Sequence, residues 1–376
     1  MNYSFTKADL ILSKALDDTF SVQDGVICDT EQKNSFDLSG YMILPGIIDL
    51  HGDGFERHLA PRRGAVKNIQ EGLRATHAEL AANGITTAVL AQFYSWEGGM
   101  RGPEFATQFF ETLQAFAPSV PSTLLPQLRF ETYMYAHYDN IVALCPKYDI
   151  PYLVFNDHLP HKELAAGKRP PRLAGQALKA HRSPDAHHAY LRELHEASDR
   201  VQKHLPDLIE ALGDTILLGS HDNASAKEHA TWAERGISIC EFPETQEAAE
   251  QAHQRGNCVV MGAPNVLRGG SHKKNVGAKL LIENHLCDAL ASDYHYPAQR
   301  LAAFQLAPQI GLEAAWALIS ANPARILGLE DRGTLYCGKR ADFIVVNKKT
   351  QGIEGTFAQG DPTYLTGELA KRLLLS

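Results

Sequence analysis

The segment LPGIIDLH at residues 44–51 is an apolar run that ends in a histidine, and Gly52 and Asp53 follow it directly. Similar short runs, rich in isoleucine, valine and leucine, recur along the chain. Such runs are typical of strands that are buried on both faces of a parallel sheet. The other seven are GITTAVLAQF (84–93), LPQLRFETY (125–133), PYLVFNDH (151–158), TILLGSH (215–221), ISICEFP (237–243), NCVVMGAP (257–264) and DALASDY (288–294).

Segments suited to helices separate these runs. Clear examples are residues 70–83, 245–256 and 312–328. Eight repeats of a strand followed by a helix predict an α/β fold, a (β/α)₈ barrel of the TIM-barrel type. A doubly wound open sheet is the alternative, but the Gly-rich first turn of that architecture is missing.

The two ends of the chain have a different character. Residues 1–43 and 331–376 contain short strand-like pieces with turn residues between them. Because chain termini often lie close together, these pieces predict one small β-sandwich domain built from both ends. Residues 44–330 then form the barrel domain.

Composition excludes several classes of protein. The 376 residues carry 36 Lys and Arg against 44 Asp and Glu, a net charge of −8, which argues against nucleic-acid or polybasic membrane binding. No apolar run approaches the roughly 18 residues of a membrane span, and the first residues do not resemble a secretion signal. The six cysteines lie far apart, without a disulfide framework. We therefore expect a cytoplasmic protein without a nucleic-acid or membrane partner.

Side chains that bind metals follow five of the eight runs. In a parallel barrel, catalytic residues lie at the carboxyl ends of the strands, and residues two apart on a strand face the same way. One such side chain alone more often caps a helix, but several together would form a costly cluster of charge without cations. The residues are His51, Asp53, Asp157, His158, His221, Glu241 and Asp293.

This mixture of histidines and carboxylates, without cysteine, predicts one or two divalent ions. Zinc is the first choice, and manganese, iron or magnesium are alternatives. Such ions supply a hydroxide nucleophile at neutral pH. Asp293 could hold the attacking water or take its proton.

Three basic loops follow the first, fourth and seventh runs. They contain Arg57 and Arg62, the segment 161–182, and residues 265–275 with Arg268, Ser271, His272 and Lys273. This pattern favours a funnel for a polyphosphate anion, and solvated loop charge is the alternative. On the third run, Arg129 and Glu131 could reach the same mouth or pair with each other.

The segment LPGIIDLHGDGFERHLAPRRGA (44–65) resembles the amidohydrolase superfamily and, within it, the PhnM-type diphosphatases of phosphonate metabolism. The resemblance continues at NDHLP (156–160), GSHDN (219–223), CEFPET (240–245) and VMGAPNVLRGGSH (260–272), and ends in the tail 321–346. Gly52 departs from the family pattern, which often has threonine between the histidine and the aspartate.

The resemblance implies a hydrolase that cleaves α-D-ribose 1-alkylphosphonate 5-triphosphate to the 5-phosphate and pyrophosphate. It places His51, Asp53, Asp157, His158, His221, Glu241 and Asp293 around the metal, and Arg268, Ser271, His272 and Lys273 at the phosphates. It also implies a phosphorylated small-molecule substrate, a homodimer and contacts with other phosphonate-pathway proteins.

Two other functions stay open. A C–N hydrolase, such as a deaminase or cyclic amidase, would use the same metals, but neutral heterocycles need no basic loops. A catalytically silent barrel that binds an anion would have lost its metal ligands, which are present in this sequence.

Overall fold

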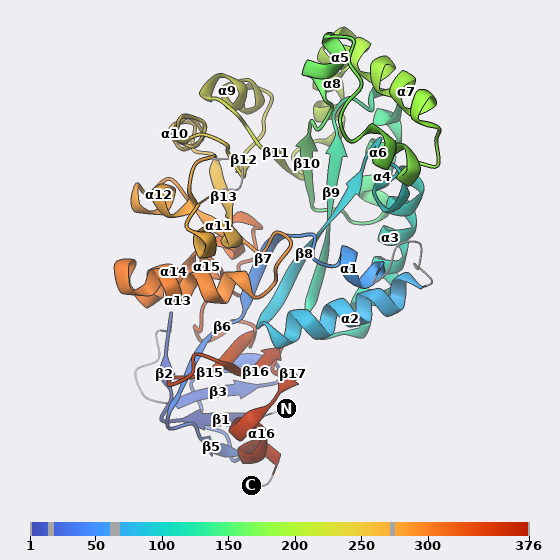
Figure 1. The fold of residues 1–376 in the computed structure, drawn as a ribbon. Coiled ribbons are helices and arrows are strands. Elements are labelled where there is room, and N and C mark those ends of the chain that lie inside the picture. Colours follow the sequence, from blue (N-terminus) through green and yellow to red (C-terminus); the bar gives the residue numbers. More distant parts are fainter. Residues whose placement is uncertain (1, 14–18, 61–67, 271–274, 375–376) are drawn as a thin grey trace. The chain divides into compact units, whose positions relative to one another are not determined.

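A computed structural model describes residues 2–13, 19–60, 68–270 and 275–374. The chain divides into two compact units, which we describe separately. The first comprises Met1–Val89, Phe116–Leu124 and Val260–Ser376, and the second comprises Leu90–Ala115 and Leu125–Val259 (Figure 1).

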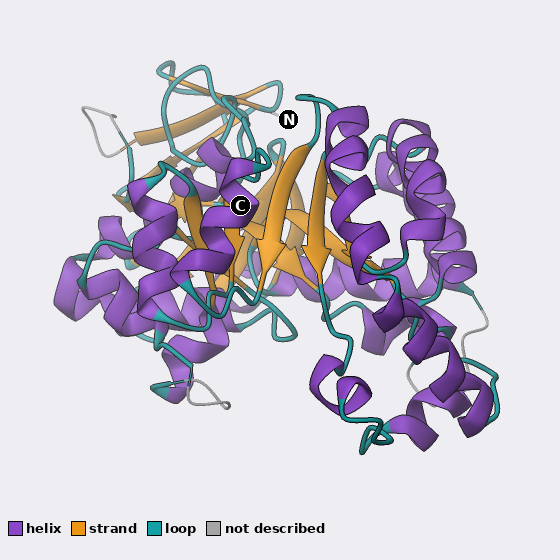
Figure 2. Cartoon of the chain, turned by 90° about the horizontal axis from the view of Figure 1, so that it is seen from above, coloured by secondary structure: helices purple, strands orange, loops and turns teal. Residues whose placement is uncertain are grey.

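The predicted (β/α)₈ architecture is confirmed, and each of the eight apolar runs contains one strand. These strands follow one another in chain order in a single eight-stranded sheet. Helices flank the strands (Figure 2). The strands are β7 (Ile47–Gly52), β8 (Ile85–Tyr94), β9 (Thr123–Glu131), β10 (Tyr152–Asn156), β11 (Leu217–His221), β12 (Ile239–Glu241), β13 (Cys258–Gly262) and β14 (Ala289–Ala291).

In the first unit, the first and last strands of this sheet meet. The backbone N–H of Asp293 donates to His51 O, and the N–H of Asp53 donates to Asp293 O, each at 2.9 Å. A parallel bridge joins Gly52 to Asp293 between them. Since β7 is buried along its whole length, its apolar sequence is explained by cover on both faces.

Helices of the first unit connect and cover its strands. The predicted helix at 70–83 is α2, which starts at an Asn68 cap whose side chain accepts from the N–H groups of Gln70 and Glu71. The helices are α1 (Glu56–Leu59), α2 (Ile69–Ala82), α11 (Ala263–Arg268), α12 (Ala278–Glu283), α13 (Ala298–Ile310), α14 (Leu312–Ala317), α15 (Ala321–Ile326) and α16 (Gly367–Leu374), with the 3₁₀ turn η2 (Ala117–Ser119).

The single helix predicted at 312–328 is wrong, because the structure has two helices there, α14 and α15. The carbonyl groups of Leu318 and Ile319, in the break between them, accept from the N–H groups of Leu290 and Ile48 at 2.9 Å. These carbonyls are therefore used by the starts of β14 and β7 instead of by a continuous helix. Pro323, early in α15, has no N–H to continue the earlier ladder.

The first unit has two further sheets. One, with the order β4-β3-β1-β5, is built from N-terminal strands alone, and the other, with the order β17-β16-β15-β6-β2, combines strands from both ends of the chain. A shared apolar core joins them. The boundaries of this domain stay a prediction. The strands are β1 (Tyr3–Thr6), β2 (Asp9–Leu10), β3 (Thr19–Gln23), β4 (Val26–Cys28), β5 (Ser35–Asp37), β6 (Tyr41–Pro45), β15 (Phe343–Asn347), β16 (Ile353–Ala358) and β17 (Asp361–Leu365).

The second unit contains β9 to β12 and the helices between them. Each strand pairs in parallel with the next, with Glu131 beside Asn156 and His221 beside Glu241 in the register. The predicted helix at 245–256 is α10. The helices are α3 (Pro103–Phe116), α4 (Tyr138–Lys147), α5 (His161–Ala165), α6 (Leu173–Lys179), α7 (Pro184–Glu196), α8 (Ser198–Leu212), α9 (Ala226–Glu234) and α10 (Gln246–Gln254), with the 3₁₀ turns η1 (Gly99–Arg101) and η3 (Tyr135–His137).

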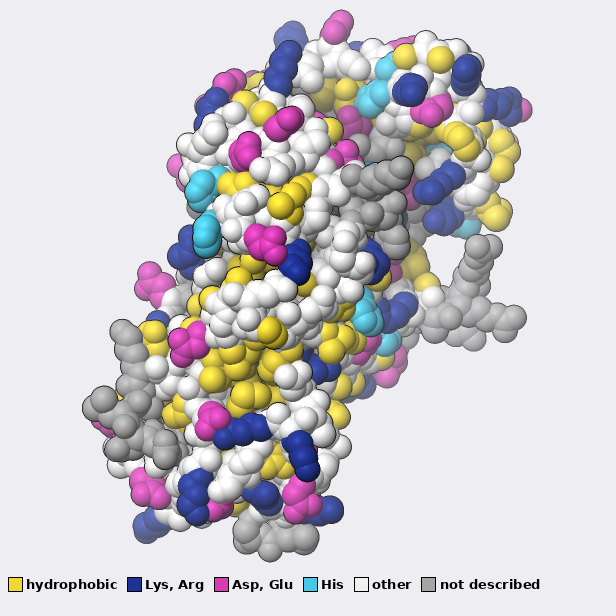
Figure 3. All heavy atoms as spheres, turned by 60° about the vertical axis from the view of Figure 1, so that its left-hand side comes forward, with side chains coloured by type: hydrophobic (Ala, Val, Ile, Leu, Met, Phe, Trp, Pro, Cys, Tyr) yellow, Lys and Arg dark blue, Asp and Glu magenta, His cyan; other side chains and the backbone are white. Residues whose placement is uncertain are grey.

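Surface and covalent features agree with the composition. Acidic and basic side chains are interspersed on the face drawn in Figure 3. No disulfide joins the six cysteines, all of which lie in the described part of the chain. Among the described helices, none combines the length and the apolar character that crossing a membrane requires.

The aromatic core of the two terminal sheets offers a test of their packing. Phe343 is fully buried, stacks on Phe357 with ring centroids 4.5 Å apart, and meets Phe20 edge-on at 4.8 Å. We expect Phe343→Ala to lower the free energy of unfolding by about 3–5 kcal/mol, because it leaves a cavity. Urea unfolding followed by circular dichroism measures this.

The control variant is Leu178→Ala, which shortens the side chain of a leucine that is 75% exposed. It is expected to change the free energy of unfolding by less than about 0.5 kcal/mol. Equal effects of the two variants would contradict a core that joins the sheets.

Candidate active site

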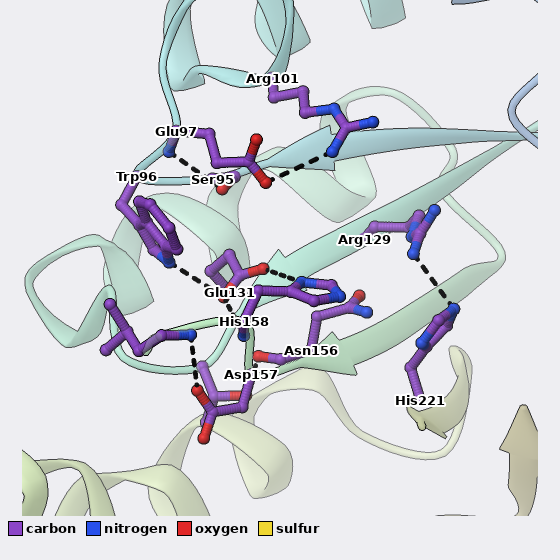
Figure 4. Close-up of polar contacts among 12 residues, drawn as sticks. Ser95, Trp96, Glu97, Arg101, Arg129, Glu131, Asn156, Asp157, His158 and His221 are labelled. Atoms are coloured by element: carbon purple, nitrogen blue, oxygen red, sulfur yellow. Dashed lines mark hydrogen bonds and ion pairs between the residues drawn. The ribbon is translucent and has the colours of Figure 1, made fainter. Parts of the chain in front are cut away.

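At the ends of β9 and β10, a buried carboxylate holds a histidine in place (Figure 4). Glu131 Oε1 lies 2.5 Å from His158 Nδ1, and Glu131 Oε2 accepts from the backbone N–H of His158 and from Trp96 Nε1, each at 3.1 Å. Glu131 is 1% exposed. Since Nδ1 is engaged, Nε2 is the nitrogen of His158 that is left to bind a ligand.

The pair shifts both ionisation equilibria toward the charged forms. Burial alone would lower the pKa of His158, but the hydrogen bond and charge of Glu131 outweigh it and raise that pKa. Burial alone would raise the pKa of Glu131, but the bonds from His158 and Trp96 lower it. The carboxylate is thus ionised and orients the imidazole electrostatically as well as sterically.

The next strand places a second histidine. Arg129 Nη2 donates to His221 Nε2 at 3.1 Å, and His221 Nδ1 lies 3.3 Å from Asp222 Oδ1. Burial lowers the pKa of His221, and the Arg129 charge adds to this effect while Asp222 opposes it. His221 is therefore neutral near pH 7, which is the form that binds metals.

Three of these side chains form a group with the chemistry of a metal site. One donor atom each from His158, His221 and Asp222 lies within 4.8 Å of the others. Two imidazoles and a carboxylate suit zinc, manganese or iron. The residues present therefore fit a divalent ion. Sequence analysis omitted Asp222, although its position directly after His221 was a signal that could have identified it.

Two predicted ligands on these strands already accept hydrogen bonds. Glu241 is fully buried, and its Oε1 accepts from Tyr152 Oη at 2.6 Å and Gln127 Nε2 at 3.1 Å. The Asp157 carboxylate lies 3.0 Å from His161 Nε2 on α5 and accepts from the backbone N–H of Leu159.

Arg129 and Glu131, which the sequence placed either at the mouth or in a pair with each other, both contact residues at strand ends. Each bonds to a histidine at the end of another strand, His221 for Arg129 and His158 for Glu131. Trp96, which the sequence analysis assigned to no role, donates to Glu131 from the turn after β8. No local sequence pattern predicts such a contact between residues that are 35 positions apart in the sequence.

In the first unit, a buried carboxylate joins β7 to the segment after β14. Asp49 accepts from the backbone N–H of Ser292 at 2.8 Å and from Ser292 Oγ at 2.5 Å. Burial raises the pKa of Asp49 to about 6, although the bonds from Ser292 oppose the rise. A Cβ at Gly52 would lie 2.6 Å from Asp49 Oδ2 and 3.0 Å from the Tyr296 ring. This explains why glycine stands where the family pattern often has threonine.

The strand-end residues of this unit share one short stretch of backbone. His51 and Asp53 flank Gly52, and both bond through their backbones to Asp293. Asp293 adopts a left-handed conformation with φ of 56°, which costs free energy in a residue with a side chain. Such strain is concentrated at functional sites.

Two predicted substrate-binding arginines of the first unit meet at Tyr294. Arg57 Nη1 donates to Tyr294 O at 3.0 Å and its Nη2 pairs with Glu79 of α2. Arg268 Nη1 donates to Tyr294 Oη at 2.6 Å. The remaining predicted phosphate contacts lie outside the described residues: Arg62, Ser271, His272 and Lys273.

Known structures share this architecture. N-acetylglucosamine-6-phosphate deacetylase from Pasteurella multocida matches with a TM-score of 0.63 at 13% identity, over 96% of this chain and 99% of that one. An adenosine deaminase from Xanthomonas campestris with bound zinc matches with a TM-score of 0.53 at 14% identity, over 97% and 94% of the two chains. The chain therefore shares the fold of these two enzymes along almost its whole length.

Sequence similarity narrows this class. No protein-family model matches the chain. The α-D-ribose 1-methylphosphonate 5-triphosphate diphosphatase of Escherichia coli (strain K12) is 32% identical over 337 residues, which are 85% of this chain and 86% of that protein. The chain belongs to this family of diphosphatases, and it is a hydrolase.

The Glu131–His158 pair predicts how metal affinity responds to mutation. We expect Glu131→Gln to weaken zinc or manganese binding about 10- to 100-fold, because the imidazole loses the carboxylate that orients it. Competition with a chromophoric chelator measures this affinity. The control is Glu234→Gln on α9, whose side chain is 65% exposed. An affinity equal to that of the control would exclude the orienting role of Glu131.

Proposed function

We propose that this chain hydrolyses α-D-ribose 1-alkylphosphonate 5-triphosphate to the 5-phosphate and pyrophosphate. The observation that carries the proposal is the 32% identity, over most of both chains, to a protein named for this activity. The histidine and carboxylate group at the ends of β10 and β11 supports it, because hydrolysis of a phosphoric anhydride suits metal assistance.

We assign the residues as follows. In the second unit, the candidate metal ligands are His158, His221 and Asp222. In the first unit, the candidate ligands are His51, Asp53 and Asp293, at the ends of β7 and β14, where barrel enzymes carry their chemistry. Asp157 and Glu241 accept hydrogen bonds from other side chains and stay candidate ligands. When bound, one or two divalent ions would lower the pKa of a water molecule and polarise the phosphoryl group.

The chain's own residues handle the proton and the charge. Water supplies the oxygen that replaces the bridging oxygen between the first and second phosphates. Asp293 is the candidate acceptor of its proton, and its backbone has the strained, left-handed conformation that is concentrated at functional sites. Arg129 is the candidate cation for the phosphates, because a guanidinium binds oxyanions in a forked geometry. Arg57 and Arg268 are candidates for the same role in the first unit.

The activity is tested directly with purified protein. We expect the ribose triphosphate to yield pyrophosphate and the 5-phosphate, resolved by ³¹P nuclear magnetic resonance. We also expect a chelator to abolish turnover and added zinc or manganese to restore it. A panel of cyclic amides and aminopurines, with ammonia measured, is the comparison. Ammonia release without pyrophosphate would replace the proposal by the C–N hydrolase, and inertness with every substrate and metal would favour a silent barrel.

A further inference from the structure

The turn after β8 is held in place from several sides. The backbone N–H of Ser95 donates to Arg101 O at 2.7 Å, and Gln92 Nε2, buried in the strand, donates to Met100 O at 2.8 Å. The N–H of Arg101 donates to Gly98 O at 3.1 Å. These bonds fix the backbone that carries the Arg101 side chain.

The neighbouring helix α6 ends against this turn. Gly98 and Gly99 have φ of 71° and 57°, and a Cβ at Gly98 would lie 2.6 Å from Ala180 Cα. Only glycine can combine this backbone conformation with so close an approach. These contacts restrict the backbone conformation of the turn. The turn therefore sets the direction in which the Arg101 side chain leaves the backbone.

Arg101 and Arg129 lie over the same aromatic ring. The guanidinium carbon of Arg101 is 4.1 Å from the Phe93 ring centroid, and that of Arg129 is 3.9 Å from it. The two cations are therefore no further apart than the sum of these distances. Phe93 is 2% exposed, so the ring position is set by packing. In Figure 4 the two arginine side chains extend the same way.

This arrangement brings two like charges together beside the metal-binding histidines. Arg129 bonds to His221, and the Phe93 ring centroid lies 6.1 Å from that of His158. Cation–π contacts engage the flat face of a guanidinium and leave its N–H edge for oxyanions. Glu97 balances part of the charge, with Oε1 3.3 Å from Arg101 Nη1. The Arg101 side chain is 31% exposed, so a ligand can reach it.

We propose that Arg101 is a substrate-binding residue that, together with Arg129, binds neighbouring phosphates of the triphosphate chain. The inference rests on the proposed function. It adds to the candidate phosphate-binding residues an arginine from a turn in which Glu97 balances the positive charge. Two guanidinium groups fixed on one ring select a chain of phosphates over a single phosphate, because only a chain presents oxyanions to both. Glu97 balances part of the Arg101 charge and is not itself needed to bind the phosphates.

The test compares four variants of the metal-loaded protein. Arg101→Gln is expected to raise KM for the ribose triphosphate, and the inhibition constant of inorganic pyrophosphate, about 10- to 100-fold, with kcat changed much less. Arg101→Lys keeps the positive charge but loses the forked N–H groups of the guanidinium. Its KM is expected to lie between those of the wild type and Arg101→Gln. Glu97→Gln is expected to leave KM unchanged or lower it. Arg255→Gln controls for the loss of one surface charge, because Arg255 is an exposed arginine at the C-terminal end of α10 that also pairs with a glutamate, Glu234.

Thermal unfolding separates binding from structure and works without turnover. Inorganic triphosphate is expected to raise the melting temperature of the wild type, Glu97→Gln and Arg255→Gln, and to raise that of Arg101→Gln much less. Equal protection of wild type and Arg101→Gln, or no protection of the wild type, would overturn the inference. A purely structural role would give a different result. The KM of Arg101→Gln would then equal that of the wild type, while Arg101→Gln and Glu97→Gln would both melt at the same temperature, below that of the wild type. If the wild type binds triphosphate but releases no pyrophosphate from the ribose substrate, the proposed function fails while this assay still decides the role of Arg101.

Discussion

The contact between Asp49 and Ser292 is the constraint on which the closure of the sheet depends. A fully buried carboxylate is costly, and its pKa of about 6 reflects that cost. Two hydrogen bonds from Ser292 offset part of the cost. Because these bonds join β7 to the end of β14, they fix the register of the two strands and thereby the positions of His51 and Asp293 at the strand ends. A slip of one residue would turn every side chain of β7 to the opposite face.

Much of this fold could be predicted because burial leaves a strong mark on sequence. Strands covered on both faces are buried at every position, as β8 is from Ile85 to Tyr94, and most of their residues are apolar. The helix expected at 312–328 failed for the opposite reason. Its break is caused by carbonyl groups that bond to β7 and β14, and no pattern within the segment reveals such distant partners.

The candidate site could be predicted only in part, for a related reason. His158 and His221 were identified by their place at strand ends, which the barrel makes meaningful. The position of a strand end does not say which atom of a side chain is engaged. For Glu131 the sequence left open a place at the mouth or a pair with Arg129, and it did not reveal the three hydrogen bonds that the carboxylate accepts from His158 and Trp96. Asp157, expected on the metal, is bonded to His161.

Charge counted along a sequence is a weak guide to where an anion binds. The basic segment 161–182 suggested a funnel, but Arg169 pairs with Asp185, and Arg182 donates to Trp96 O while lying over the Tyr190 ring. Arg101 escapes the same count because Glu97, four residues earlier, cancels its charge. What distinguishes Arg101 is geometry: a fixed turn and a ring shared with Arg129. A buried aromatic side chain that fixes two cations is therefore a stronger sign of an anion site than an excess of lysine and arginine in a loop. The two cations are already ordered in the folded protein, so binding an anion costs less conformational entropy.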